Sequence, residues 1–189
     1  MPHPLQVTIR LAEPDRDAEA IAAIYRPAVN ASVATFEQVA PDASEMAHRI
    51  RRTLDRTPWL LAEDAHGQLL GYAYAGAHRD RTGYRWSVDI SAYVDQRHLG
   101  RGVGRTLYDS LLGILRRQRF INVYAGIALP NPASIALHDA VGMRRIGVYE
   151  RVGYKFGAWH DVAWYGMRLQ DPPNPPAEPI PLPDLPPQR

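Results

Sequence analysis

One stretch of this chain runs from a strand pattern through a glycine-rich loop into a helix pattern, and it limits the folds open to the chain. Apolar and polar residues alternate over residues 86–94, as in a strand with one buried face. Apolar residues recur at helical spacing over residues 103–115. Between them, Gly100, Gly102 and Gly104 permit a sharp turn and a close approach of backbone to ligand. Because the first N–H groups of a helix lack partners, this arrangement predicts an anion site.

Two common nucleotide motifs do not fit this loop. A P-loop ends in Gly-Lys-Ser/Thr, and the loop has no lysine. The dinucleotide fingerprint requires Gly or Ala at its last position, where Arg105 stands. What remains is a strand, a G-x-G-x-G loop and a helix, with Arg97, Arg101 and Arg105 around the turn.

The pattern along the whole chain predicts an α/β (α+β) protein of one domain, residues 1–169, followed by a tail. The expected order is β-α-α-β-β-β-α-β-α-β-β, a mixed sheet covered by helices on both faces. Asp15 or Asp17 is expected to cap the first helix and Pro27 to end or kink it. Residues 154–160 are expected to form an aromatic loop between the last two strands. Residues 170–189 hold nine of the seventeen prolines and predict an extended, non-catalytic tail, draped over the domain or mobile.

Bulk composition excludes some chemistry. The chain has no cysteine, so a thiolate nucleophile, a disulfide and a thiolate metal site are ruled out. Its formal net charge is only +2, and its arginines are spread along the chain, which argues against nucleic-acid binding. No apolar run approaches the ~20 residues of a membrane span. We therefore expect a cytoplasmic protein without a membrane or nucleic-acid partner.

The run R-H-L-G-R-G-V-G-R-T-L-Y, which follows A-Y-V, resembles the acetyl-coenzyme A loop of the GNAT N-acetyltransferases. The likeness is greatest to the phosphinothricin N-acetyltransferase branch, continues over residues 128–143 and 153–162, and covers roughly residues 7–169. Where this family usually has Gln or Arg before the loop, this chain has Leu99. The resemblance implies the GNAT fold, with a mostly antiparallel sheet and splayed central strands. It also implies a homodimer and acetyl-CoA as co-substrate, without a metal.

The resemblance further implies which residues contact acetyl-CoA. The end of the central strand pairs with the pantetheine arm, the loop and helix start bind the phosphates, and an asparagine that also suits a helix N-cap contacts the arm. The residues are Ala92, Tyr93, Val94, Gly100, Arg101, Gly102, Val103, Gly104, Arg105 and Asn131. For Arg101 and Arg105, a solvated surface position is the alternative.

Asp89 and His138 match the family's catalytic positions. Asp89 stands where the family has a glutamate, one methylene longer, so the resemblance implies a general base that works through a bridging water. His138 stands where many GNAT enzymes have a tyrosine, which implies the acid for the leaving thiolate. For both residues a structural role is the alternative. The resemblance places Arg81, Tyr84 and Phe36 around the acceptor.

These features predict transfer of acetyl from acetyl-CoA to the amine of a small amino acid-like substrate, of the phosphinothricin or methionine sulfoximine type. Attack is expected to be direct, because the chain lacks cysteine. Two alternatives remain open from the sequence. One is a protein or peptide N-acetyltransferase, which would need an open groove. The other is a non-catalytic acyl-CoA sensor, which would keep the loop and tolerate loss of Asp89.

Overall fold

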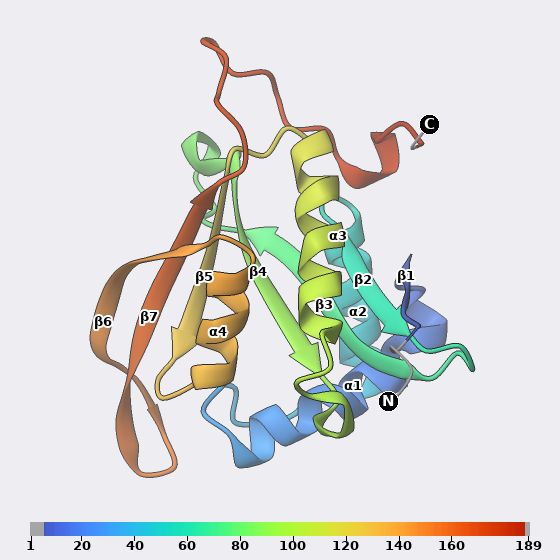
Figure 1. Ribbon diagram of the computed structural model, residues 1–189, viewed down its shortest axis with the longest axis vertical. Coiled ribbons are helices and arrows are strands. Elements are labelled where there is room, and N and C mark those ends of the chain that lie inside the picture. Colours follow the sequence, from blue (N-terminus) through green and yellow to red (C-terminus); the bar gives the residue numbers. More distant parts are fainter. Residues whose placement is uncertain (1–5, 188–189) are drawn as a thin grey trace.

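The computed structural model describes residues 6–187, and its elements follow the predicted order. The seven strands and four helices of these residues are shown in Figure 1. They are β1 (Thr8–Leu11), α1 (Pro14–Ala31), α2 (Ala43–Leu54), β2 (Trp59–Glu63), β3 (Leu69–Ala77), β4 (Ser87–Val94), α3 (Val103–Arg117), β5 (Asn122–Ala128), α4 (Pro132–Ala140), β6 (Arg144–Lys155) and β7 (Ala158–Arg168).

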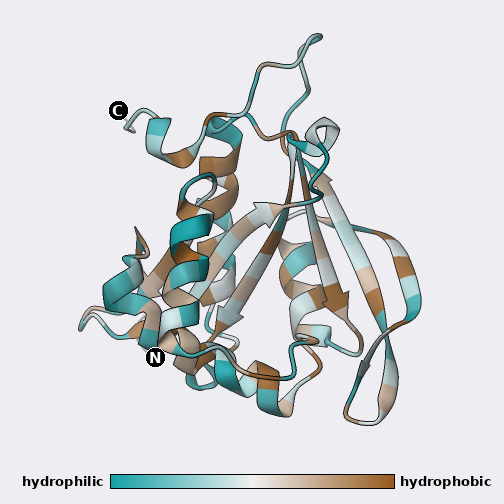
Figure 2. Ribbon diagram, turned by 180° about the vertical axis from the view of Figure 1, so that it is seen from behind, coloured by the Kyte–Doolittle hydropathy of each residue, from teal (hydrophilic) through white to brown (hydrophobic). Residues whose placement is uncertain are grey.

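All seven strands form one sheet in the order β1-β2-β3-β4-β5-β7-β6. Only the β4–β5 pair is parallel, and each other neighbouring pair is antiparallel. Helices α1 and α2 cover one face and α3 and α4 the other, with a separate hydrophobic core under each layer. In the view from behind, hydrophilic and hydrophobic residues alternate around the turns of α1 and α2, as expected for helices with one buried face (Figure 2). The predicted mixed, mostly antiparallel sheet is confirmed.

The two central strands separate soon after they meet. Strands β4 and β5 pair only from Ser87–Asn122 to Asp89–Tyr124. Beyond that point β4 continues to Val94 and β5 to Ala128 without further pairing, so a wedge opens between them (Figure 1). The splayed central strands expected from the family resemblance are therefore present.

Of the two outcomes predicted for Pro27, an end or a kink of α1, the end is wrong, because the helix continues through Pro27 to Ala31. The ammonium group of Lys155 donates to the carbonyl oxygens of Ala28, Ser32 and Thr35, at 3.5, 2.8 and 2.7 Å. Ala28 lies in the last turn of the helix, where carbonyls lack intrahelical partners, while Ser32 is the C-cap and Thr35 lies beyond it. Lys155 thus ties the end of α1 and the segment after it to the β6–β7 hairpin.

The predicted cap of α1 is also wrong. Glu13 is the N-cap residue and makes no capping bond through its side chain. Asp17 instead accepts a hydrogen bond from the Glu13 N–H at 2.7 Å and pairs with Arg10 from β1. The carboxylate therefore ties the helix start to the first strand. By contrast, the expected cap of α2 is present, since Asp42 accepts from the Glu45 N–H.

Residues 154–160 do not form the expected aromatic loop. Strand β6 continues to Lys155 and β7 begins at Ala158, so only Phe156 and Gly157 connect them. Both residues have positive φ, 52° and 77°. Two such residues are typical of a tight hairpin turn, which is usually filled by Asn-Gly. The pair Phe-Gly is not a common signal for this turn, so the sequence does not predict it.

The tail from residue 170 onward lies across one end of the domain in the part that the structure describes (Figure 1). Glu178 pairs with Arg85, and the Trp86 indole N–H donates to the Ala177 carbonyl. The side-chain NH2 of the fully buried Gln118 donates to the carbonyl oxygen of Ile180 at 2.8 Å, and the Gln118 backbone carbonyl accepts from the Ile180 N–H at 2.8 Å. Within residues 6–187, no helix is both long enough and apolar enough to cross a membrane.

Deleting residues 172–189 is expected to lower the free energy of unfolding by about 1–3 kcal/mol, because buried polar groups of Gln118 lose their partners. Urea denaturation measures the change. The matched control is Glu178→Gln, which removes only an exposed ion pair and should leave the urea midpoint nearly unchanged. An unaltered midpoint in the truncated chain would show that the tail does not hold this position in solution.

Candidate active site

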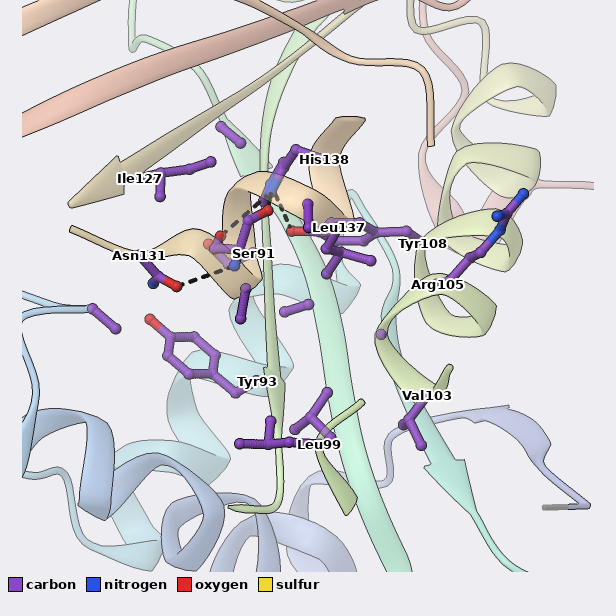
Figure 3. A pocket seen from close by; sticks show the side chains of 18 of the residues that line it. Ser91, Tyr93, Leu99, Val103, Arg105, Tyr108, Ile127, Asn131, Leu137 and His138 are labelled. Carbon is purple, nitrogen blue, oxygen red and sulfur yellow. Dashed lines mark hydrogen bonds between the residues drawn. The ribbon is translucent and has the colours of Figure 1, made fainter. Parts of the chain in front are cut away.

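The wedge between β4 and β5 leads into a cavity of about 480 Å³. Its walls come from the second half of β4, the second half of β5, the start of α3 and one side of α4 (Figure 3). Nine of the ten predicted acetyl-CoA residues line it, together with His138. Arg101 does not line the cavity and is exposed.

The glycine loop supplies backbone donors at one end of this cavity. Gly100 and Gly102 have φ of 70° and 83°, the left-handed region that glycine adopts without strain. Gly102 is the N-cap of α3 and has no side chain to bond the first N–H groups of the helix. These groups and the helix dipole face a site that suits phosphate.

Gly104 has a different role from its two neighbours. A Cβ at this position would lie 3.0 Å from Leu137 Cδ2 on α4. The missing side chain therefore lets α3 and α4 approach closely across the cavity. Asn131 begins α4 by accepting a hydrogen bond from the Ser134 N–H at 3.0 Å, as predicted for a cap.

Asp89 lies at the apex of the wedge, in the last residue pair that joins β4 to β5. It does not line the cavity itself but shares a strand face with Ser91 and Tyr93, which do. Burial raises the pKa of Asp89, while the hydrogen bond from His78 opposes the shift. The His78 Nδ1 atom lies 2.6 Å from Asp89 Oδ1.

His138 is buried and held by two partners. Its Nδ1 lies 2.7 Å from the Ser134 carbonyl oxygen, so Nδ1 carries the hydrogen and Nε2 is the acceptor. The Tyr108 hydroxyl lies 3.2 Å from Nε2 and donates to it (Figure 3). Burial lowers the pKa of His138, so the ring is neutral near pH 7.

The three predicted acceptor residues do not form one cluster. Tyr84 packs edge-on against His78, with ring centroids 6.0 Å apart, and so lies near Asp89. Arg81 lines a separate cleft between the β3–β4 connection and the tail. Phe36 packs on the β6–β7 hairpin, where its ring fills the space that a side chain at Gly153 would need.

Sequence reasoning missed His78 and Tyr108. His78 follows the end of β3, and the register of the β3–β4 hairpin brings it beside Asp89. Correct pairing of the two strands across their nine-residue connection would have found it. Tyr108 lies on the apolar face of α3, and nothing in its spacing distinguishes it from the core residues of that face.

Comparison with known proteins agrees with this geometry. Residues 9–164 match the family model described as an acetyltransferase (GNAT) domain. Phosphinothricin N-acetyltransferase of Streptomyces viridochromogenes is 38% identical over 161 residues, which are 84% of this chain and 87% of that protein. L-methionine sulfoximine/L-methionine sulfone acetyltransferase of Pseudomonas aeruginosa is 36% identical over 154 residues, 81% of this chain and 90% of that protein.

A solved structure gives the same picture. The GNAT phosphinothricin acetyltransferase of Sinorhizobium meliloti, in complex with acetyl-CoA, aligns with a TM-score of 0.82 and 37% identity. The alignment covers 86% of this chain and 88% of that one. This chain belongs to the GNAT acetyltransferase family. Within the family it falls in the phosphinothricin N-acetyltransferase-like branch, and it is an N-acetyltransferase.

Gly102→Ala is expected to weaken acetyl-CoA binding, because an alanine at φ 83° costs about 1–2 kcal/mol. The free loop can relieve this strain by leaving the conformation that presents its N–H groups, so acetyl-CoA must restore that conformation on binding. The cost corresponds to a roughly 5- to 30-fold rise in Kd, measured by isothermal titration calorimetry. Gly113→Ala on the same helix is the control. Its added Cβ meets nothing within 4 Å, so it should stabilise the helix and leave Kd unchanged. Equal Kd values for both variants would contradict a role of the loop backbone.

Protein stability is expected to fall as pH drops below about 6.5, partly through His138. Because the pKa of His138 is lowered in the folded state, the unfolded chain binds its proton first on acidification. The slope from this one group is at most about 1.4 kcal/mol per pH unit. Urea unfolding between pH 5 and 7.5 should show a shallower slope for His138→Gln. The exposed control, His66→Asn, should keep the wild-type slope, and an equally steep His138→Gln profile would refute the assignment.

Proposed function

We propose that this enzyme transfers acetyl from acetyl-CoA to the amine of a small amino acid-like substrate, of the phosphinothricin or methionine sulfoximine type. The observation that carries the proposal is the wedge, which runs from backbone phosphate donors at α3 to a half-buried carboxylate at its apex. The two named relatives, whose printed names give these acceptors, support the substrate class.

The donor is proposed to bind along the wedge. N–H groups at the start of α3 hold its phosphates, with Arg105 at the rim, and Arg101 adds charge from the surface. The free backbone edge of β4 over Ala92, Tyr93 and Val94 bonds the pantetheine arm, which Asn131 contacts from α4. This backbone is available because β4 and β5 no longer pair there.

Asp89 is proposed as the general base. It takes a proton from the acceptor ammonium, directly or through one water, and the neutral amine then attacks the thioester carbon. The tetrahedral intermediate loses a second N–H proton as the carbon–sulfur bond breaks. Its raised pKa suits this role, because a carboxylate with a pKa nearer neutrality is a better base. Gly76 stands opposite Asp89 in β3, and its missing side chain leaves space for the amine.

His138 is proposed to pass a proton to the departing thiolate. The neutral ring first takes up at Nε2 the second proton that the acceptor nitrogen loses, and the imidazolium, whose pKa is lowered by burial, then gives that proton to the sulfur. The Tyr108 hydroxyl at Nε2 extends this path along the cavity wall. On the acceptor side, Tyr84 lies near enough to Asp89 to contact the substrate, while Arg81 and Phe36 would contact it only from more distant parts of the surface.

Asp89→Asn is expected to lower kcat about 10²- to 10⁴-fold with an unchanged Kd for acetyl-CoA, because the amide cannot accept the proton. The assay follows free thiol released with phosphinothricin, methionine sulfoximine and related amines. Asp171→Asn, whose side chain is 94% exposed, is the control and should keep full activity. If Asp89→Asn keeps the wild-type kcat, Asp89 is not the general base.

The same assay separates the alternatives. A peptide or protein acetyltransferase would release thiol with peptide amines and not with free amino acids. A sensor would bind acetyl-CoA with no turnover of any amine. The arginines of the β3–β4 connection favour a small anionic acceptor.

We also propose that the β6–β7 hairpin forms a homodimer interface in a cytoplasmic enzyme. Large apolar side chains are exposed along it, and Figure 2 shows its hydrophobic stretches. They are Ile146, Tyr149, Val152, Tyr154, Phe156 and Trp159. Light scattering should give twice the chain mass of 21.2 kDa, and Trp159→Glu should give the monomer. Val39→Glu, at an exposed apolar residue elsewhere, should stay dimeric, and a monomeric wild type would reject the interface.

A further inference from the structure

His78 makes the closest side-chain contact with the proposed base. Its Nδ1 atom lies 2.6 Å from Asp89 Oδ1, and the two side chains are 16% and 33% exposed. The imidazole is packed between aromatic rings, with centroids 4.5 Å from Tyr124 and 6.2 Å from Trp164. Tyr84 closes a third side. The ring is thus fixed by packing, independently of its bond to the carboxylate.

The strand register explains the geometry of the pair. Asp89 stands directly opposite Gly76, and His78 lies two residues after Gly76, just past the end of β3, diagonally across the same face. A Cβ at Gly76 would meet nothing within 4 Å. The carboxylate therefore has an imidazole on one side and open space on the other.

The two carboxylate oxygens have different surroundings. The hydrogen bond from His78 ends on Oδ1. Among residues 6–187, no hydrogen bond reaches Oδ2. A neutral imidazole that donates through Nδ1 would hold Oδ1 and prevent rotation of the group, so that Oδ2 alone stays free to accept a proton.

We propose that His78 is a positioning residue for the acetyl transfer, which fixes the Asp89 carboxylate through Nδ1–H···Oδ1 and leaves Oδ2 for the acceptor amine. This inference rests on the proposed function of Asp89. During the reaction the N–H bond of the acceptor breaks and an O–H bond forms at Oδ2, while His78 keeps its own proton. The proton then leaves Asp89 to solvent, and the pair returns to its starting state.

Charges around the pair set the direction of its titration. The positive charge of Arg79, just past the end of β3, lowers the pKa of Asp89 against the rise that burial causes. Tyr84 from the β3–β4 connection and Tyr124 from β5 face His78. Burial raises the pKa of Asp89, and the His78 hydrogen bond and Arg79 lower it. Removing the hydrogen bond should therefore raise the pKa of Asp89 further, because the charged form loses a donor.

Two variants at one position test the proposal. His78→Asn keeps an N–H donor near the place of Nδ1 but cannot take up a proton, whereas His78→Phe keeps the ring packing and has no donor. His78→Phe should lower kcat roughly 10-fold or more, less than the ~10²- to 10⁴-fold expected for loss of the base itself. His78→Asn should recover most of that loss, and the KM for acetyl-CoA should be unchanged in both. His66→Asn, in the exposed β2–β3 turn, is the control and should match wild type.

A second readout does not depend on turnover. The Asp89 side-chain carboxyl carbon, followed by NMR against pH, should have a higher titration midpoint in His78→Phe than in wild type, with His78→Asn between them. Wild-type kcat in His78→Phe would overturn the proposal, and so would equal damage by both variants, which would make His78 itself the proton acceptor. If wild type acetylates no amine, the proposed function fails separately. In that case, an identical titration midpoint of Asp89 in wild type and His78→Phe would show that His78 does not hydrogen-bond the Asp89 carboxylate in solution.

Discussion

The short parallel pairing of β4 with β5 is the constraint on which the site depends. Three residue pairs join the strands, and the last contains Asp89. Beyond it, the backbone of β4 has no partner on the β5 side, although β3 still pairs with its other edge. Backbone polar groups that are left unpaired away from water are costly. A pantetheine arm, which contains amide groups, can satisfy them. In the proposed binding mode, the same break that exposes the backbone therefore creates the binding site, and it places the carboxylate where the site ends.

The remaining structure serves to hold that wedge open. Gly104 allows α3 and α4 to approach across the cavity, and Asn131 starts α4 at its wall. On the other face, Tyr25, Tyr72 and Tyr93 pack together beneath β4 and fix its second half. Lys155 joins the end of α1 to the β6–β7 hairpin. Side chains from distant segments thus position two strands that do not hold each other.

Most features that depend on local sequence were predictable, apart from the α1 cap and the Phe156-Gly157 turn, and features that depend on distant contacts were not. The element order, the glycine loop and the Asn131 cap follow from residues within one turn of each other. The bonds that hold the end of α1 come from Lys155, 127 residues beyond Ala28. The bond from His78 to Asp89 depends on hairpin register, and the bond from Tyr108 to His138 on the packing of two helices. These are the contacts that tune the candidate catalytic groups, so the sequence indicates the site more clearly than it indicates how the site works.

A crystal structure with acetyl-CoA would show directly where the donor lies. We expect the phosphates to contact the N–H groups at the start of α3 and the pantetheine arm to bond the backbone of β4 beyond Asp89. The thioester should lie at the apex of the wedge, within reach of the Asp89 carboxylate through at most one water. A thioester on the far side of α4, or an arm that does not enter the wedge, would contradict the proposed binding mode.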